Sequence, residues 1–184
     1  NFHPPLWMRP WVALDAIGFY LSRIVVPLGL LPDYGRSPQF LLESGSFWYA
    51  ALGFWGVATL VVKRVPGDIR LAGLQMLMWI APVLGLISFR FQDVSTVSDH
   101  YLYLGLIPLI LVLSPRLDKR VGVGLCAIFI GLSAMQVRYW RDTETLANRV
   151  LELNPRSFSF HNALADDLAY QKQYREALKH YSQS

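Results

Sequence analysis

The residues best suited to chemistry lie in one short polar stretch between two apolar segments, from Arg90 to Leu104. Apolar residues precede it over 71–89 and follow it over 104–113. The stretch holds two acids, an arginine, a histidine and two tyrosines. Ionisable residues concentrated at a membrane face are typical of a functional site, so we expect a ligand to bind here.

The start of the second apolar segment is predicted to bind an anion, such as the phosphate of a lipid carrier. Ser98 or Asp99 is a good N-cap, and the helix start presents unpaired N–H groups and the positive end of its dipole. Arg90 would add a full positive charge, and Tyr103 lies four residues after Asp99, on the same helical face. The alternative is that Asp99 only caps, Arg90 only extends to the interface, and the tyrosines only form an interfacial belt.

The composition predicts an all-α, polytopic transmembrane protein. Of 184 residues, 53% are hydrophobic and only 16% are charged, against about 25% charged in soluble domains. Asp15 and Arg23, inside the first apolar segment, are expected to face other helices, although that segment could instead lie along the membrane interface. By length and hydropathy we expect about five spans, at 11–31, 47–62, 71–89, 101–113 and 121–137.

The basic residues predict how these spans are oriented. They are scattered through short loops, which argues against a nucleic-acid-binding patch. The positive-inside rule assigns the more basic set of loops to the cytoplasm; it holds Arg9, Lys63, Arg64, Arg70, Arg116, Lys119 and Arg120. The polar stretch and the carboxyl end then face the outer (periplasmic) side.

Small residues are predicted where helices approach closely; they are Gly53, Gly56, Gly122, Gly124 and Gly131. The sequence holds no phosphate-binding glycine loop, no paired-cysteine metal spacing and no catalytic serine motif. Its four histidines have no metal-ligand spacing, and its single cysteine cannot form an internal disulfide. We therefore assign no catalytic residue, no metal and no cofactor.

The character of the chain changes after residue 137, which predicts two domains, 1–137 and 138–184. In the second, apolar positions recur at helical spacing. They predict three amphipathic helices, at 143–153, 158–171 and 174–183.

The last two of these helices resemble a tetratricopeptide repeat. The positions that would pack the repeat are Leu164, Ala165, Tyr174, Ala177 and Tyr181. His161 stands at the usual tryptophan position and Lys172 at the usual turn glycine. One and a half repeats bury a solenoid face poorly, so we expect further chain or a partner to complete it.

The whole layout resembles the carboxyl-terminal half of the membrane module, plus the first repeat, of bacterial tetratricopeptide-repeat proteins with a GT-C-type glycosyltransferase fold. These are relatives of the transmembrane and tetratricopeptide-repeat O-mannosyltransferases. The specific motif is Asp99-His100 followed by 101–104 (Tyr-Leu-Tyr-Leu), with Gly105 where the family commonly has proline. His100 stands at the usual arginine position, which reduces the permanent positive charge for a lipid phosphate.

The resemblance implies transfer of a sugar from a polyprenyl-phosphate carrier to an extracytoplasmic acceptor. Asp99 and His100 would orient the carrier phosphate, assisted by Arg90 and Tyr103. The outer loop with paired acids that the family uses lies outside this sequence, so we expect a fragment of a longer transferase. The alternative is a non-catalytic transmembrane scaffold or accessory subunit. Such a subunit would contact membrane lipids and dock other membrane or periplasmic subunits through its repeat.

Overall fold

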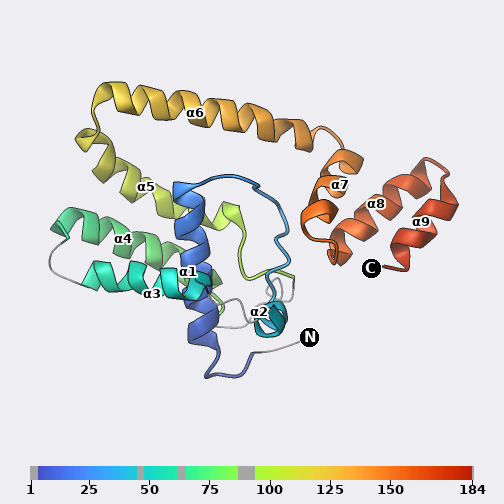
Figure 1. Cartoon of the computed structure of the whole chain (residues 1–184), viewed down its shortest axis with the longest axis horizontal. Coiled ribbons are helices and arrows are strands. Elements are labelled where there is room, and N and C mark those ends of the chain that lie inside the picture. Colours follow the sequence, from blue (N-terminus) through green and yellow to red (C-terminus); the bar gives the residue numbers. More distant parts are fainter. Residues whose placement is uncertain (1–3, 45–47, 62–64, 87–93, 184) are drawn as a thin grey trace. The chain divides into compact units, whose positions relative to one another are not determined.

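The computed structural model describes residues 4–44, 48–61, 65–86 and 94–183. Over these residues the chain is helical and contains no strand (Figure 1), which confirms the predicted all-α class. The chain divides into two compact units. Unit 1 comprises Asn1–Leu30 and Arg36–Gly124, and unit 2 comprises Leu31–Gly35 and Leu125–Ser184.

Unit 1 is built from two helix pairs. Helix α1 (Arg9–Val25) packs along α3 (Trp48–Val61), and α4 (Gly67–Ile80) packs along α5 (Leu102–Leu113). A short helix, α2 (Pro38–Ser44), lies between α1 and α3 in the sequence.

The contact between α1 and α3 depends on glycines. A Cβ atom on Gly53 would lie 1.9 Å from the carbonyl oxygen of Leu14, and one on Gly18 would lie 1.8 Å from that of Tyr49. Neither approach is sterically possible, so the two backbones come this close only because both positions lack a side chain. The prediction of close approach at Gly53 is confirmed, and a Cβ on Gly56 would likewise clash with a neighbouring leucine.

The prediction of about five membrane spans is wrong. Among the described residues, one helix is long and apolar enough to cross a bilayer. Helices α1, α3, α4 and α5 have 17, 14, 14 and 12 residues, whereas crossing takes about 20. Two of the apolar segments are longer than their helices because proline blocks helix continuation: α1 ends at Val25, shortly before Pro27, and α4 ends at Ile80, shortly before Pro82.

The one helix that is long enough comprises α6 (Lys119–Val137) and the 3₁₀ turn η5 (Arg138–Trp140). This 22-residue segment is strongly apolar, and none of its residues is buried. A Cβ atom added at Gly122, Gly124 or Gly131 would meet nothing within 4 Å among the described residues. The predicted packing at these three glycines is therefore not formed within the described chain.

Unit 2 contains the three amphipathic helices at nearly the predicted bounds. They are α7 (Thr143–Leu153), α8 (Phe158–Tyr170) and α9 (Tyr174–Tyr181), each packed on the next. The side chain of Asp142 caps α7 by accepting a hydrogen bond from the Thr145 N–H at 2.8 Å. This satisfies one of the unpaired donors at the start of the helix.

A small apolar core joins these three helices; it contains Ala147, Leu164, Leu168 and Ala177. Of the five predicted repeat-packing residues, Leu164, Ala165 and Ala177 are buried. The other two lie at the surface, with Tyr174 61% and Tyr181 40% exposed. Assignment to the tetratricopeptide family stays a prediction.

Two further features shape unit 2. Lys172, at the position where we noted that a glycine is usual, adopts a left-handed backbone conformation with φ of 66°, which a side chain disfavours.

Asp33 is buried, and its carboxylate accepts a hydrogen bond from the Ser157 hydroxyl at 2.5 Å. Ser157 also caps α8 by accepting from the Phe160 N–H at 3.3 Å. Asp33 therefore holds the segment 31–35 against the start of α8.

Candidate functional site

The first half of the described part of the predicted polar stretch is buried, over residues 95–98. Ser95, Thr96 and Ser98 lie in the interior of unit 1, and residues 99–101 form a single 3₁₀ turn, η3, before α5 begins. Arg90 lies outside the described residues. The side chains of Ser95, Thr96 and Ser98 thus fold inward, whereas those of His100 and Tyr103 stay at the surface.

Ser98 connects this stretch to α1. Its N–H donates to the Tyr20 hydroxyl at 3.2 Å, and that hydroxyl lies 3.4 Å from the Ser98 carbonyl oxygen, to which it donates. Ser98 is the N-cap residue of η3, but its hydroxyl pairs with Nδ1 of His100 at 2.8 Å and makes no capping bond. The helix α5 has Tyr101 at its N-cap, so the predicted cap of this helix by Ser98 or Asp99 is not formed.

The remaining predicted site residues lie close in sequence but differ in exposure. Asp99 is half-buried, His100 is exposed, and Tyr103 is 67% exposed. The His100 ring lies against the Tyr101 ring, with centroids 4.1 Å apart. Their binding of a carrier phosphate stays a prediction.

A buried ion pair lies at the centre of unit 1. The Arg36 guanidinium donates to the Asp15 carboxylate at 2.6 Å, with the Asp15 side chain fully buried and that of Arg36 only 11% exposed. The guanidinium also lies over the Tyr49 ring, 4.7 Å from its centroid. Asp15 thus faces inward, as the sequence predicted, and both the charge and the ring stabilise the cation.

The same arginine joins three segments. Its carbonyl oxygen accepts two hydrogen bonds from Thr96, from the N–H and from the hydroxyl, both at 2.9 Å. Arg36 therefore ties the buried stretch 95–98 to α1 and α3 at once. We call this group, Asp15, Tyr20, Arg36, Thr96 and Ser98, the buried polar cluster.

Burial dominates the electrostatics of the buried polar cluster. It raises the pKa of Asp15, and the nearby Arg36 charge and hydrogen bond only partly oppose this. It also raises the pKa of Tyr20 to about 12. Asp15 Oδ1 and Arg36 Nε have no hydrogen-bond partner among the described residues. Removing either Asp15 or Arg36 would leave an unpaired charge in the interior, which costs folding free energy.

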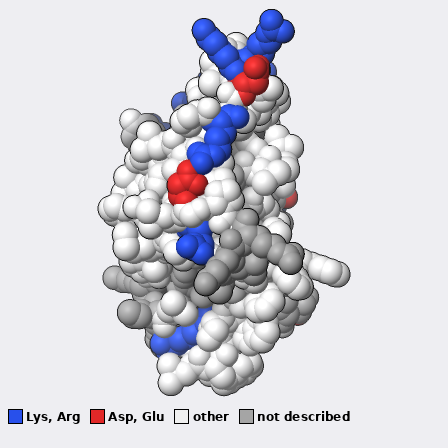
Figure 2. Space-filling model, turned by 90° about the vertical axis from the view of Figure 1, so that its left-hand side faces the viewer, with Lys and Arg blue, Asp and Glu red and all other residues white. Residues whose placement is uncertain are grey.

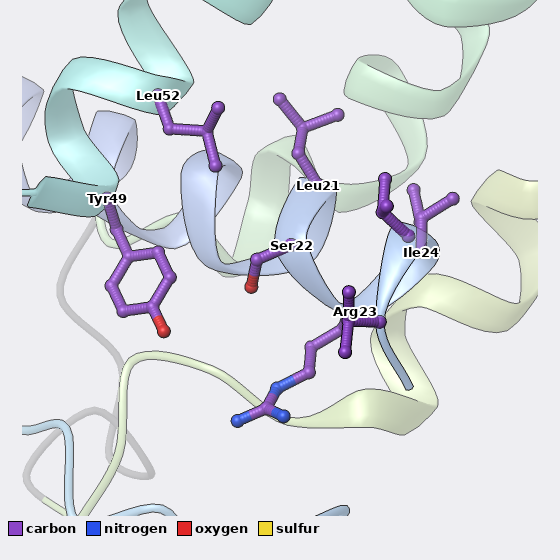
Figure 3. A pocket seen from close by; sticks show the side chains of 8 residues that line it. Leu21, Ser22, Arg23, Ile24, Tyr49 and Leu52 are labelled. Carbon is purple, nitrogen blue, oxygen red and sulfur yellow. The ribbon is translucent and has the colours of Figure 1, made fainter. Parts of the chain in front are cut away.

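A pocket of about 520 Å³ lies beside the second half of α1 (Figure 3). Its wall is mostly apolar, and Arg23 contributes the one charged side chain among its lining residues. In Figure 3 the Arg23 guanidinium and the Tyr49 hydroxyl extend on the same side of the α1 ribbon. The Arg23 guanidinium donates to the Leu28 carbonyl oxygen and lies 4.8 Å from the centroid of the Phe19 ring.

The sequence flagged Asp15 but missed its partner. Arg36 stands in a turn-rich segment, where an arginine is usually solvated, and Tyr20 and Thr96 carried no motif. Only the odd presence of an acid in an apolar segment indicated that a buried cation must lie nearby.

No group of three histidine, cysteine or acidic side chains in the described residues could hold a metal ion. Comparison with known proteins adds no relative: no family model, no curated protein and no solved structure matches the chain.

Proposed function

We propose that this chain is a membrane-anchored helical scaffold, held in a bilayer by the segment Lys119–Trp140, and that α7, α8 and α9 dock a protein partner. The observation that carries the proposal is that this apolar segment is exposed: none of its residues is buried. Its 22 residues extend about 33 Å as a helix, which matches a hydrocarbon core of about 30 Å.

The ends of the segment have the residues expected at the two membrane surfaces. Lys119 and Arg120 begin it, and Arg138, Tyr139 and Trp140 end it. Basic and aromatic side chains favour the interface between hydrocarbon and water. Bilayer hydrocarbon would cover the apolar side chains between them, which otherwise lie in water.

The docking role is supported by the surface of α9. Tyr174, Leu178 and Tyr181 recur at intervals of four and three residues, which places them on one helical face, and they are 61%, 68% and 40% exposed. Exposed apolar stripes of this kind are typical of helix-to-helix contacts with a partner.

Vesicle flotation tests the anchoring. The full chain should float with neutral phosphatidylcholine vesicles. An aspartate at the centre of a span costs about 3 kcal/mol, so Ile130→Asp should lower the partition coefficient about 100-fold. The matched control is Leu178→Asp on α9, which is as exposed as Ile130 (68% against 71%) and should float normally. Equal flotation of both variants would contradict the anchor.

A second candidate function is the lipid-linked sugar transfer implied by the resemblance. The pocket beside α1 favours it, because an apolar wall with one guanidinium suits a long-chain anion. Reduced glycan transfer in Arg23→Gln and Asp99→Asn, with normal transfer in Lys179→Gln, would support this candidate over the scaffold.

A further inference from the structure

Basic side chains from three segments gather at one end of unit 1. Arg70 lies in the first turn of α4, Arg116 in the 3₁₀ turn η4 (Ser114–Arg116), and Lys119 and Arg120 begin α6. Figure 2 shows Lys and Arg side chains projecting from this end, with acidic side chains between them. We call Arg70, Arg116, Lys119 and Arg120 the basic end.

One ion pair joins two of these segments. The Arg116 guanidinium donates to the Asp68 carboxylate, so η4 is fixed against the start of α4. Both side chains are about half exposed, at 46% and 48%, and such surface pairs add little stability. By fixing η4 against the start of α4, the pair holds Arg116 near the turn that contains Arg70, and Arg116 stays accessible to solvent.

Local structure does not account for the positive charge. The basic end has four cations, and its two acids, Asp68 and Asp118, leave it with a net charge of +2. The Asp118 carboxylate accepts the Arg120 backbone N–H at 2.8 Å, which leaves the Arg120 side chain outside that bond. Lys119 and Arg120 oppose the dipole of α6, whose first turn holds no acid. The two basic side chains at this position therefore do not stabilise α6, and their presence needs another explanation.

We infer that the basic end binds the headgroups of an anionic phospholipid leaflet. The inference rests on the proposed anchoring by Lys119–Trp140, because that segment would place Lys119 and Arg120 at the membrane surface. Basic residues immediately beside a span are attracted to anionic lipids, and each is expected to contribute up to about a fivefold preference. Arginine can also bind a phosphate through two parallel hydrogen bonds.

Spin-labelled lipids measure this preference directly. The full chain is reconstituted in vesicles containing equal amounts of phosphatidylcholine and phosphatidylglycerol. A trace of one spin-labelled lipid then reports the fraction of that lipid held at the protein. At low salt we expect the protein to hold several-fold more phosphatidylglycerol than phosphatidylcholine. In 0.5 M salt this preference should decrease markedly, because the Debye length falls to roughly a few ångströms.

The variant Lys119→Gln/Arg120→Gln should lose most of this preference. Its matched control is Arg175→Gln/Lys179→Gln, which removes the same two charge types from exposed positions on α9 and should keep it. A wild-type ratio of one, or equal ratios in the two double variants, would overturn the inference while leaving the anchor intact. Absence of protein-held lipid of either kind would instead overturn the anchor, and this inference with it.

Discussion

The ion pair between Asp15 and Arg36 is a buried contact whose two charges depend on each other. Asp15 has no exposed surface, and burial raises its pKa in spite of the neighbouring guanidinium. Removing one member leaves an uncompensated charge in the interior, whereas replacing both by apolar residues of similar size is often neutral. The stability of unit 1 should therefore depend on the pair as a unit.

A double-mutant cycle tests this dependence. Arg36→Met should lower the free energy of unfolding by about 3–5 kcal/mol, because Asp15 remains buried and unpaired. Asp15→Leu/Arg36→Met should recover most of that loss. Denaturant unfolding of the full chain in a fixed detergent measures both. A double variant as unstable as the sum of its single variants would show that the two charges are not coupled.

Two histidines in unit 2 form a contact that depends on protonation. His161 Nε2 lies 3.0 Å from the Pro155 carbonyl oxygen, which can only accept, so this nitrogen carries the proton. His161 Nδ1 then accepts from His180 Nδ1, also at 3.0 Å. If both rings carried two protons, the two Nδ1 atoms would both be donors and this hydrogen bond could not form.

The pair predicts that α9 is less stable in acid. Burial, together with the nearby charges of His161 and Lys179, lowers the pKa of His180, although Glu176 on the same helix opposes this. Because the unfolded chain then binds more protons than the folded one, stability falls as the pH drops below about 6.5.

Hydrogen exchange of the α9 amides measures this loss. After correction for intrinsic rates, protection at pH 5.5 should be lower than at pH 7.5. His180→Gln keeps a polar side chain without a charge change in this range, and its protection should be the same at both values. A wild-type protection that does not change with pH would contradict the lowered pKa of His180.

At the scale of elements, the α1–α3 pair depends on backbone contact. Gly53→Ala would place a methyl group 1.9 Å from the Leu14 carbonyl oxygen. The helices must separate, at a cost of at least the 1–3 kcal/mol typical of overpacking. Thermal unfolding followed by circular dichroism measures it.

The control for this variant is Gly122→Ala. An added Cβ meets nothing within 4 Å at that position, and alanine is favoured over glycine in a helix by about 1 kcal/mol. Gly122→Ala should therefore be neutral or stabilising. A loss of stability as large as that of Gly53→Ala would mean that glycine serves helix flexibility and not close packing.

Local signals were enough to predict the helices of unit 2. The apolar spacing predicted the bounds of α7, and α8 and α9 begin at the predicted residues. In unit 1 the sequence did not predict the helix bounds as well, because hydropathy alone does not show where proline ends a helix. Proline shortens α1 and α4 in this way, while the apolar segments of α3 and α5 are themselves too short, so one of about five expected spans is present among the described residues.

The candidate site was harder to predict than the helices. The sequence located the polar stretch before α5 but could not show that Thr96 and Ser98 are buried. The partners Arg36 and Tyr20 lie 60 and 78 residues from them along the chain. Contacts over such separations depend on tertiary packing, which local patterns do not encode.

At the scale of the whole molecule, two kinds of surface lie on one chain. The segment Lys119–Trp140 is apolar and exposed, whereas α7 to α9 carry mixed charge around a small core. An exposed apolar surface of this extent is typical of contact with lipid or another apolar partner. The scaffold proposal follows from this contrast.

The single cysteine offers the most direct test of the anchor. Cys126 is exposed in the described chain and lies about one third of the way along Lys119–Trp140, about 10 Å from its start. Since the described protein does not cover it, its protection from a charged maleimide in permeabilised vesicles must come from lipid or from another chain. In the Cys126→Ala background, Arg175→Cys on α9 reports the reactivity of a solvated thiol.

In phosphatidylcholine vesicles that contain only this protein, we predict that Cys126 stays unlabelled until sodium dodecyl sulfate is added. The cysteine at position 175 should react at once. Labelling of Cys126 in intact bilayers at the rate of the cysteine at position 175 would contradict the membrane anchor.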